Sequence, residues 1–564
     1  MWKRILIGLA IVLVAAGALA FFNRKSIIFH MVKRAAQVEV ADNRPIVWVP
    51  GPATPATDRS EGPPNIVFIL ADDLGYNDIS TFGGGFAGGA VPTPNIDRLA
   101  AQGAIFTNAY SGTGTCAPSR AMLMTGRYPS RTGFEFTPMP PSMPRIVGML
   151  SEDTQEGSGL PEGTSNLDIP DDAEMVEFED MGLPPEEVTI AEALKPQGYH
   201  SIHIGKWHLG RSERFRPVEQ GFDESLLMSS GLYLPEDDPG VVNAKLDFDP
   251  IDRFLWGILS YAAEYNRAGE AFVEDRFEPG GYLTDYWTDE ALKAIEANRN
   301  QPFFLYLAHW GPHTPLQATV EDYEVVGDIE PHRLRVYAAM IRAVDRSVGR
   351  VMEKLEEEGL AENTIIVFSS DNGGAGYLGL PDVNEPFRGW KITLFEGGIR
   401  VPMFVSWPGR IAPGTVVDDP VAHVDVLPTL AAAAGASLPE GRAIDGRNML
   451  PVAMGEADAI QRDNDAIFWS SGFYKVVRAG DWKLQLNERQ DRRWLFNLAD
   501  DPTEQVNLAE TRPDKLAELD ALIEAHWADA RAPLYPHLTE SPVCIDNTIV
   551  DRPCDPDNYV IWPN

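Results

Sequence analysis

The stretch that decides the fold is NIVFILA (65–71), a short apolar run of strand length that leads directly into Asp72 and Asp73. Runs of the same kind recur at HSIHIG (200–205), FFLYLA (303–308), TIIVFSS (364–370) and MFVSW (403–407). Helical patterns separate several of them, and the clearest, at 335–358, places its apolar residues on one stripe and ends at Gly359. Strands that alternate with amphipathic helices predict an α/β fold, a large mostly parallel sheet sandwiched by helices.

A different pattern follows after about residue 440, where four short strand-like runs succeed one another through tight turns. They are AIFWS (466–470), YKVVRA (474–479), DWKLQL (481–486) and RWLFN (493–497). With a helical pattern at about 513–529, they predict a smaller C-terminal antiparallel sheet plus one packed helix. The expected organisation is an N-terminal signal or anchor segment (1–36), a linker (37–63), a catalytic domain (64–440), a C-terminal subdomain (441–535) and a tail (536–564).

Two stretches look like insertions into the catalytic domain. Residues 151–190 contain thirteen acidic and no basic residues, and residues 232–280 include the aromatic segment FLWGILSYAAEY (254–265). Surface decoration and loops that shape the rim of a binding site are both open interpretations of these stretches.

Composition restricts the class of protein. The 564 residues include 47 Lys and Arg against 83 Asp and Glu, a formal net charge of −36. A chain this acidic is poorly suited to binding nucleic acid through its phosphates, so no nucleic-acid partner is expected. With 44% hydrophobic and 10% aromatic residues, the chain can bury a large core and is a globular protein.

The N-terminus has the features of an export segment. Residues 1–36 carry six basic and no acidic residues, and an uncharged, mostly apolar run occupies 5–22. That run reaches the lower limit for a membrane span and is longer than the apolar core (h-region) of a typical signal peptide. Because Ala18-Leu19-Ala20 resembles a cleavage site, a retained membrane tether through residues 5–22 and a cleaved signal are both open.

Charge and cysteine placement give opposing indications about the side of the membrane. The basic residues after the apolar run outnumber those before it, which favours a cytoplasmic body by the positive-inside rule. Cys544 and Cys554 lie in a Pro- and Asp-rich tail, where a disulfide would close easily and persist only in an oxidising compartment. We expect an extracytoplasmic body, in the periplasm or at the cell surface.

Residues with useful chemistry follow the predicted strands. Ligands of an open parallel sheet bind outside the carboxyl ends of its strands. Four of the predicted strands run into such groups: Asp72-Asp73 after 65–71, Lys206 and His208 after 200–205, His309 and His313 after 303–308, and Asp371-Asn372 after 364–370. Their agreement predicts one site at one edge of the sheet.

This set combines oxygen ligands with basic groups. Asp72, Asp73, Asp371 and Asn372 offer only oxygen atoms, which suit Ca²⁺ or Mg²⁺. Carboxylates packed together would repel one another unless a cation lay among them. The basic members are Arg120, Lys206, His208, His313 and Lys391. Positive charge in so acidic a protein indicates an anionic group on the substrate.

Cys116 lies in TGTCAPSRAMLMTGRYPSRTG (113–133), after a Gly/Thr/Ser loop and ahead of a short helical pattern. A helix N-terminus favours negative charge, which makes a reactive thiol the better interpretation than an inert one. The segment CAPSRAMLMTGR (116–127) matches Cys-x-Pro-Ser-Arg-x-x-Leu-x-Thr-Gly-Arg at every fixed position. It resembles the signature of type I sulfatases of the arylsulfatase kind, which are formylglycine-dependent enzymes of the alkaline phosphatase superfamily.

The resemblance covers about residues 64–535, and further motifs carry it in the same order. They are ADDLGYND (71–78), PTPNIDRLAAQGAIFTNAY (92–110), GKWHLG (205–210), PHTPLQ (312–317), SSDNGG (369–374) and EGGIRVP (396–402). The resemblance implies a hydrolase that cleaves sulfate esters to an alcohol or phenol and sulfate. The substrate would be a small sulfate ester or a sulfated carbohydrate.

The resemblance also implies roles for the residues. A separate maturing enzyme would oxidise Cys116 to formylglycine, an aldehyde that hydrates to a gem-diol. One diol oxygen would attack the sulfur atom of the ester and release the alcohol. The second diol oxygen would then lose its proton and expel sulfate, which regenerates the aldehyde. Asp72, Asp73, Asp371 and Asn372, with the oxygen derived from Cys116, would bind a divalent cation, usually calcium. Arg120 would position the formylglycine, His208 would assist the diol proton, Lys206 and Lys391 would hold sulfate oxygens, and His313 would protonate the leaving oxygen.

Three alternatives stay open at this point. A phosphodiesterase or phosphonate monoester hydrolase would share the scaffold, the metal and sometimes the formylglycine. A non-catalytic binding protein with this fold would be expected to have lost a ligand or the cysteine, and every such position is intact here. His309, an additional histidine near His313, could exchange roles with it.

Overall fold

The computed structural model describes residues 24–35, 38–55, 62–82, 85–140, 142–151, 160–161, 163–165, 176–380, 382–546 and 553–564. The apolar run at 5–22 and much of the acidic stretch lie outside these residues. None of the helices in the described ranges is both long enough and apolar enough to cross a membrane.

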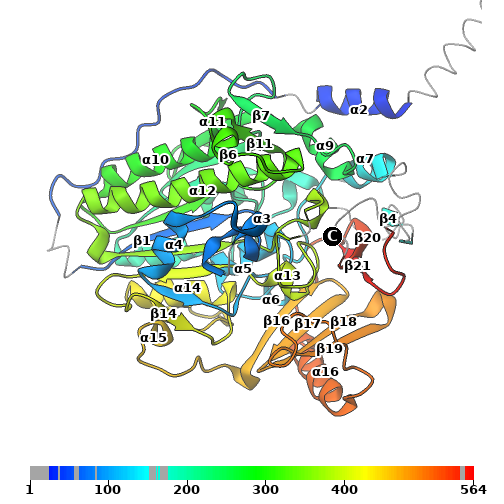
Figure 1. The fold of residues 1–564 in the computed structure, drawn as a ribbon. Helices are drawn as coiled ribbons and strands as arrows, with labels where there is room; N and C mark the ends of the chain where they lie inside the picture. Colours follow the sequence, from blue (N-terminus) through cyan, green and yellow to red (C-terminus); the bar gives the residue numbers. More distant parts are fainter. Residues whose placement is uncertain are drawn as a thin grey trace, which may run out of the picture.

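A large sheet forms the centre of the molecule (Figure 1). In spatial order its strands are β14 (Thr415–Val417), β2 (Ala104–Phe106), β13 (Met403–Ser406), β12 (Thr364–Ser370), β1 (Asn65–Ala71), β10 (Phe303–Ala308), β5 (His200–Gly205), β6 (Glu224–Gly231), β8 (Tyr261–Arg267) and β9 (Arg276–Phe277). The central strands from β12 to β6 pair in parallel, whereas β13 and β8 pair antiparallel to their neighbours. The expectation of a mostly parallel sheet is confirmed.

Strand β1 shows why the sheet needs helices on both faces. Its alternate side chains enter two separate cores: Val67 and Ile69 belong to one, and Ile66 and Phe68 to the other. All seven residues of the strand are buried. An apolar run without polar alternation is therefore stable only where both faces are covered.

Helices cover both faces (Figure 1). The first face carries α4 (Pro94–Ala101), α10 (Leu283–Asn298), α11 (Val320–Val325) and α12 (His332–Glu357). The second carries α5 (Cys116–Thr125), α8 (Ile190–Leu194), α14 (Val426–Ala433) and α15 (Leu450–Ala453). The stripe predicted on α12, from Val336 to Leu355, lies entirely in the first core.

The segment 232–280 extends the central sheet. It contributes strands β8 and β9 at one edge, together with β7 (Val241–Ala244) and the helix α9 (Pro250–Ile258). Strand β7 pairs with β11 (Leu316–Thr319), and a further small pair joins β3 (Ala109–Tyr110) to β15 (Val421–Ala422). Helices α2 (Arg24–Ala35), α3 (Phe86–Gly89), α6 (Pro129–Thr132), α7 (Ser142–Ser151) and α13 (Glu396–Ile399) complete the chain up to residue 453.

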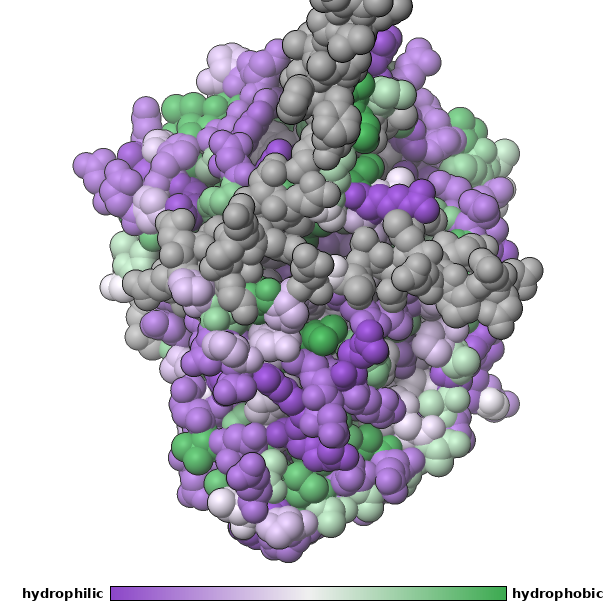
Figure 2. Space-filling model, turned by 90° about the vertical axis from the view of Figure 1, so that its right-hand side faces the viewer, coloured by the Kyte–Doolittle hydropathy of each residue, from purple (hydrophilic) through white to green (hydrophobic). Residues whose placement is uncertain are grey.

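The smaller C-terminal sheet matches its prediction closely. Antiparallel strands β16 (Ala466–Ser471), β17 (Tyr474–Ala479), β18 (Trp482–Asn487) and β19 (Arg492–Asn497) pack against α16 (Pro513–Trp527). Strands β20 (Thr539–Cys544) and β21 (Tyr559–Pro563) form a last sheet with β4 (Thr164–Ser165). The disulfide between Cys544 and Cys554 is present, as predicted. Hydrophilic residues predominate on the lower half of the face in Figure 2, in keeping with the acidic composition.

Candidate active site

The carboxyl ends of four neighbouring strands converge on one site. Strand β1 leads into Asp72 and Asp73, β12 into Asp371, β5 into Lys206 and β10 into the segment that ends at His313. Asp73 adopts a left-handed backbone conformation with φ of 61°, which few residues other than glycine adopt without strain. Such conformations gather at functional sites because the surrounding structure has to hold them in place.

The carboxylates and the cationic side chains form one buried network. Lys206 Nζ lies 2.6 Å from Asp72 Oδ2, and Lys391 Nζ lies 2.7 Å from Asp73 Oδ1. Burial alone would raise the pKa of Asp73, but Lys391 and other nearby positive groups outweigh it and hold that pKa below its usual range. For Asp72, burial and the neighbouring Asp371 carboxylate prevail and raise the pKa to about 7.

Arg120 joins two of the strand ends. Its Nε and Nη2 each lie 2.8 Å from Asp371 Oδ2, Nη2 lies 3.4 Å from Asp72 Oδ2, and Nη1 donates to the backbone oxygen of Lys206 at 3.1 Å. The side chain is fully buried. Burial opposes its charge, but Asp371 and its other neighbours raise the pKa of Arg120 above its usual value, so the guanidinium is charged.

The charge balance corrects one step of the sequence argument. Asp72, Asp73 and Asp371 were expected to repel one another without a metal cation, but the folded chain supplies cations of its own. Three cationic side chains, Arg120, Lys206 and Lys391, face the three carboxylates at salt-bridge distance. These cations offset much of the repulsion, although the Asp371 carboxylate still helps to raise the pKa of Asp72, so further support for a metal site has to come from unsatisfied ligand atoms.

Two observations supply that support. Asp72, Asp73, Cys116 and His313 each offer a ligand atom, and these atoms lie within 4.8 Å of one another in a buried cluster. Asn372 Oδ1 is buried and accepts no hydrogen bond from any described residue, although the Nδ2 atom of the same amide donates to Asp73 Oδ1 at 2.8 Å. A buried carbonyl oxygen beside carboxylates is a ligand that Ca²⁺ or Mg²⁺ accepts. The oxygen atoms of Asp72, Asp73 and Asn372 therefore fit a hard divalent cation, whereas the thiol of Cys116 and the imidazole of His313 do not.

Cys116 begins helix α5 in the middle of this network, as the sequence predicts. Its Sγ lies 3.5 Å from Asp72 Oδ1 and 3.8 Å from Asp73 Oδ1. Burial raises the pKa of the Cys116 thiol well above its usual value, and Asp371 and Asp72 add to the rise. Desolvation and the nearby carboxylates therefore oppose the expected activation of this thiol by the helix N-terminus.

The histidines take distinct positions. His313 Nε2 lies 3.5 Å from Asp73 Oδ2, and its ring stacks on Trp310 at 3.9 Å. Burial lowers the pKa of His313 to about 3. His309 is fully buried and its Nε2 hydrogen-bonds Ser347 on helix α12 at 2.8 Å. His313, not His309, is therefore the histidine beside the carboxylates.

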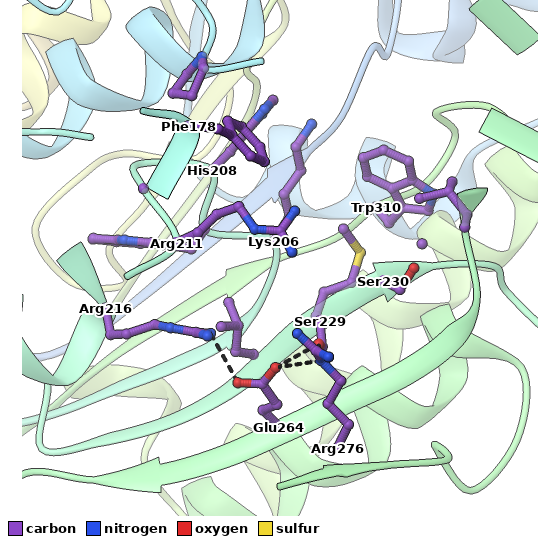
Figure 3. Close-up of a pocket in the computed structure, with 17 residues that line it drawn as sticks. Phe178, Lys206, His208, Arg211, Arg216, Ser229, Ser230, Glu264, Arg276 and Trp310 are labelled. Atoms are coloured by element: carbon purple, nitrogen blue, oxygen red, sulfur yellow. Dashed lines mark hydrogen bonds and ion pairs between the residues drawn. The ribbon is translucent and has the colours of Figure 1, made fainter. Parts of the chain in front are cut away.

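A pocket opens beside Lys206 and His208 (Figure 3). Burial lowers the pKa of His208 well below its usual value, and the Lys206 and Arg120 charges add to this effect. Most of the pocket lining was not predicted from the sequence, including Trp310, Arg211, Arg216 and Arg276. Arg211 and Arg216 follow GKWHLG within a few residues, and Trp310 lies between His309 and His313. Arg276 lies in 232–280, a stretch for which a role at the rim of a binding site was open, and only the fold brings it beside the others.

Family models match most of the chain. The sulfatase model matches residues 64–436, and the model described as N-sulphoglucosamine sulphohydrolase, C-terminal, matches residues 389–530.

Known proteins resemble the chain over most of its length. The N-acetylgalactosamine-6-sulfatase of Mus musculus is 32% identical over 431 residues, which cover 75% of this chain and 72% of the relative. The steryl-sulfatase of Homo sapiens is 30% identical over 483 residues, with 75% of each chain covered. The solved structure of Ps i-CgsB in complex with k-i-k-neocarrahexaose is 30% identical, with a TM-score of 0.66 over 84% of this chain and 94% of that one.

Proposed function

The chain belongs to the sulfatase family, whose members hydrolyse sulfate esters, and from this premise we propose that it acts through a formylglycine made from Cys116 together with a divalent cation. The observation that carries the proposal is the position of Cys116, buried within 3.8 Å of Asp72 and Asp73 at the start of α5. A neutral thiol in this setting is a poor nucleophile. An aldehyde hydrate at the same position would offer two oxygens to the same neighbours.

The conversion needs an oxidant and a separate maturing enzyme. The side-chain carbon loses its sulfur and gains an aldehyde oxygen, a two-electron oxidation that this chain alone does not supply. Asp72, Asp73, Asp371 and Asn372 would hold the cation, calcium or magnesium. When bound, such a cation supplies Lewis-acid stabilisation of negative charge on oxygen.

The remaining residues bind and orient the ester. Lys206 and Lys391 pair with different carboxylates of the cluster, so their ammonium groups can donate to sulfate oxygens from two sides. Arg120, held by Asp371, orients the residue at position 116. His208, which lines the pocket beside Lys206, would accept a proton from the hydrated aldehyde.

His313 would donate the proton to the leaving oxygen. In the free protein its low pKa keeps the imidazole neutral at physiological pH. The negative charge of a bound sulfate ester favours the protonated imidazole. We therefore expect His313 to gain its proton with the substrate and to release it to the alcohol as the ester bond breaks.

We infer that the natural substrate is a sulfated carbohydrate and that the body works outside the cytoplasm. N-acetylgalactosamine-6-sulfatase and the neocarrahexaose complex of Ps i-CgsB support the first point, and steryl-sulfatase is the counter-example among the relatives. The Cys544–Cys554 disulfide supports the second, because such a bond persists in oxidising compartments. We also retain the division at about residue 440 between the catalytic domain and the C-terminal subdomain.

Mass spectrometry of the peptide that contains Cys116 tests the mechanism. Protein produced with a maturing enzyme should carry an aldehyde in place of the thiol and hydrolyse 4-nitrophenyl sulfate, and Cys116→Ala should be inactive but folded. Arg350→Ala, which removes only a surface ion pair with Asp289 on the opposite face of the sheet, serves as the control. Substantial activity in Cys116→Ala would refute the mechanism. Faster hydrolysis of nitrophenyl phosphonates than of nitrophenyl sulfate would favour the alternative of a phosphonate monoester hydrolase.

A further inference from the structure

The pocket beside the reacting groups is lined by cationic and aromatic side chains. Its volume is about 240 Å³, below the roughly 300–1,000 Å³ of a drug-sized site, which suits one sugar ring with its substituents. Lys206 and His208 stand at the end next to the carboxylates, and three arginines, Arg211, Arg216 and Arg276, line the rest (Figure 3). Arg211 and Arg216 lie on the loop between β5 and β6, and Arg276 begins β9.

Two of the arginines are held in place by one buried carboxylate. Glu264 is only 1% exposed, and it pairs with Arg216 at 3.0 Å and with Arg276 at 3.2 Å. Ser229 Oγ donates to Glu264 Oε1 at 2.6 Å and accepts from Arg276 Nε at 2.9 Å. Arg276 also pairs with Glu274. The charges of Glu264 and Glu274 therefore balance those of Arg216 and Arg276. These contacts also hold both guanidinium groups in place.

Arg211 is the third arginine of the pocket, and its positive charge is not balanced by a carboxylate of the described residues. Its guanidinium carbon lies 5.2 Å from the centre of the Phe178 ring. Within the part of the chain that the structure describes, it forms no ion pair and no hydrogen bond. The net charge of this arginine group is therefore positive, in a chain whose net charge is −36. Arg211 is an exposed side chain that lines the pocket, and unmatched positive charge at such a place raises the local concentration of anions.

The pocket wall also offers flat apolar surface. Trp310 and Phe178 present aromatic rings, and Met228 and Leu259 lie among the lining residues. Lys206 Nζ lies 4.6 Å from the Trp310 ring centre, so this ring connects the pocket to the groups that would hold the reacting sulfate. Aromatic faces with a few fixed polar groups are typical of sites that bind a ring and set its orientation.

We propose that this pocket binds a second anionic group, a sulfate or a carboxylate on the sugar ring next to the one that is hydrolysed. The substrate would then be a polyanionic carbohydrate, and Arg211 would be the residue that selects it. Guanidinium groups favour this assignment, because their planar fork matches the oxygens of a carboxylate or sulfate better than an ammonium group does. The inference rests on the proposed sulfatase function.

Four substrates test the proposal: 4-nitrophenyl sulfate and three sulfated disaccharides whose neighbouring ring carries a sulfate, a carboxylate or no charge. In the wild type, kcat/KM should be higher for the charged disaccharides, and the preferred one identifies the second group. Arg211→Ala should lower the ratio of kcat/KM for the preferred disaccharide to that for 4-nitrophenyl sulfate by about 10- to 100-fold. Arg211→Glu should lower it further, and added salt should reduce the wild-type ratio.

The neighbouring Arg214 provides a matched control. It is an exposed arginine on the same loop, it pairs with Asp180 at 2.7 Å, and it does not line the pocket. Arg214→Ala should leave the ratio unchanged. A second measurement, calorimetric affinity of the Cys116→Ala protein for the disulfated disaccharide with and without Arg211→Ala, reports binding without turnover.

The two measurements separate the two ideas. If the wild type hydrolyses 4-nitrophenyl sulfate, but Arg211→Ala and Arg211→Glu leave both the ratio and the affinity unchanged, the second-anion site is refuted and the sulfatase function stands. If the wild type hydrolyses no sulfate ester while Arg211→Ala still weakens binding by 10-fold or more, the proposed function is refuted and the anion site stands.

Discussion

Replacing Arg120 with methionine removes the one guanidinium buried among the carboxylates and keeps a side chain of similar length. The Asp371 carboxylate loses two contacts of 2.8 Å, and Asp72 loses one of 3.4 Å. Breaking a buried ion pair from one side costs about 3–5 kcal/mol, because the remaining charge stays buried. With an unfolding entropy of about 2.1 cal/mol/K per residue, the matched residues 64–436 give roughly 0.8 kcal/mol/K. The expected drop in melting temperature is therefore about 4–6 °C.

Differential scanning calorimetry in the presence of a chelator measures this drop without help from a bound cation. Arg350→Met is the matched control, because Arg350 pairs with Asp289 on the surface. The two side chains are 33% and 50% exposed. Such a pair contributes about 0–1 kcal/mol, or roughly 1 °C. Arg120→Met should also lose sulfatase activity. If Arg120→Met melts within 1 °C of the wild type, or no lower than Arg350→Met, the buried-charge reasoning is wrong.

Three further predictions concern the lysines of the site, the metal and a buried carboxyl of the C-terminal subdomain. Lys206→Ala and Lys391→Ala should each lower kcat/KM for 4-nitrophenyl sulfate by about 10²-fold, and losses below a few-fold in both would place the sulfate elsewhere. Chelation should abolish turnover and calcium or magnesium should restore it, with weaker metal binding in Asn372→Ala; full activity after exhaustive chelation would contradict the ligand assignment. Burial raises the pKa of Glu504 from 4.5 to about 7 despite Lys483, so the folded state binds more protons than the unfolded state over this range. The melting temperature should therefore fall as pH rises from about 4.5 to 7. Calorimetry of Glu504→Gln should show a shallower fall, and an unchanged slope would show that this carboxyl does not cause the pH dependence.

Local sequence patterns predicted the strands that carry the site. The bounds predicted for β1, β5, β10 and β12 agree with the structure, because a buried parallel strand is a short apolar run and needs no distant information to be recognised. Strand β13 ends one residue earlier than expected and pairs antiparallel to β12. Its direction depends on the path of the chain through α13, which no periodicity within the strand records.

The edge strands were harder to predict for a physical reason. Residues 232–280 looked like an insertion, yet they supply β8 and β9 of the central sheet. Strand β8 is buried at one end and half-buried at the other, so its apolar pattern is weak. Edge pairing depends on the neighbouring strand as much as on the strand itself.

By itself, the sequence determined which residues could take part in catalysis and that they follow buried strands, since residue type and strand-forming pattern are local properties. The tertiary structure alone decided their physical state. Arg120 reaches Asp371 across 251 positions of sequence, and the neutral thiol of Cys116 results from burial among carboxylates brought from elsewhere. The surplus charge of Arg211 likewise depends on which carboxylates the fold places beside the other arginines. Charge balance and desolvation are sums over spatial neighbours, and those neighbours exist only once the chain has folded.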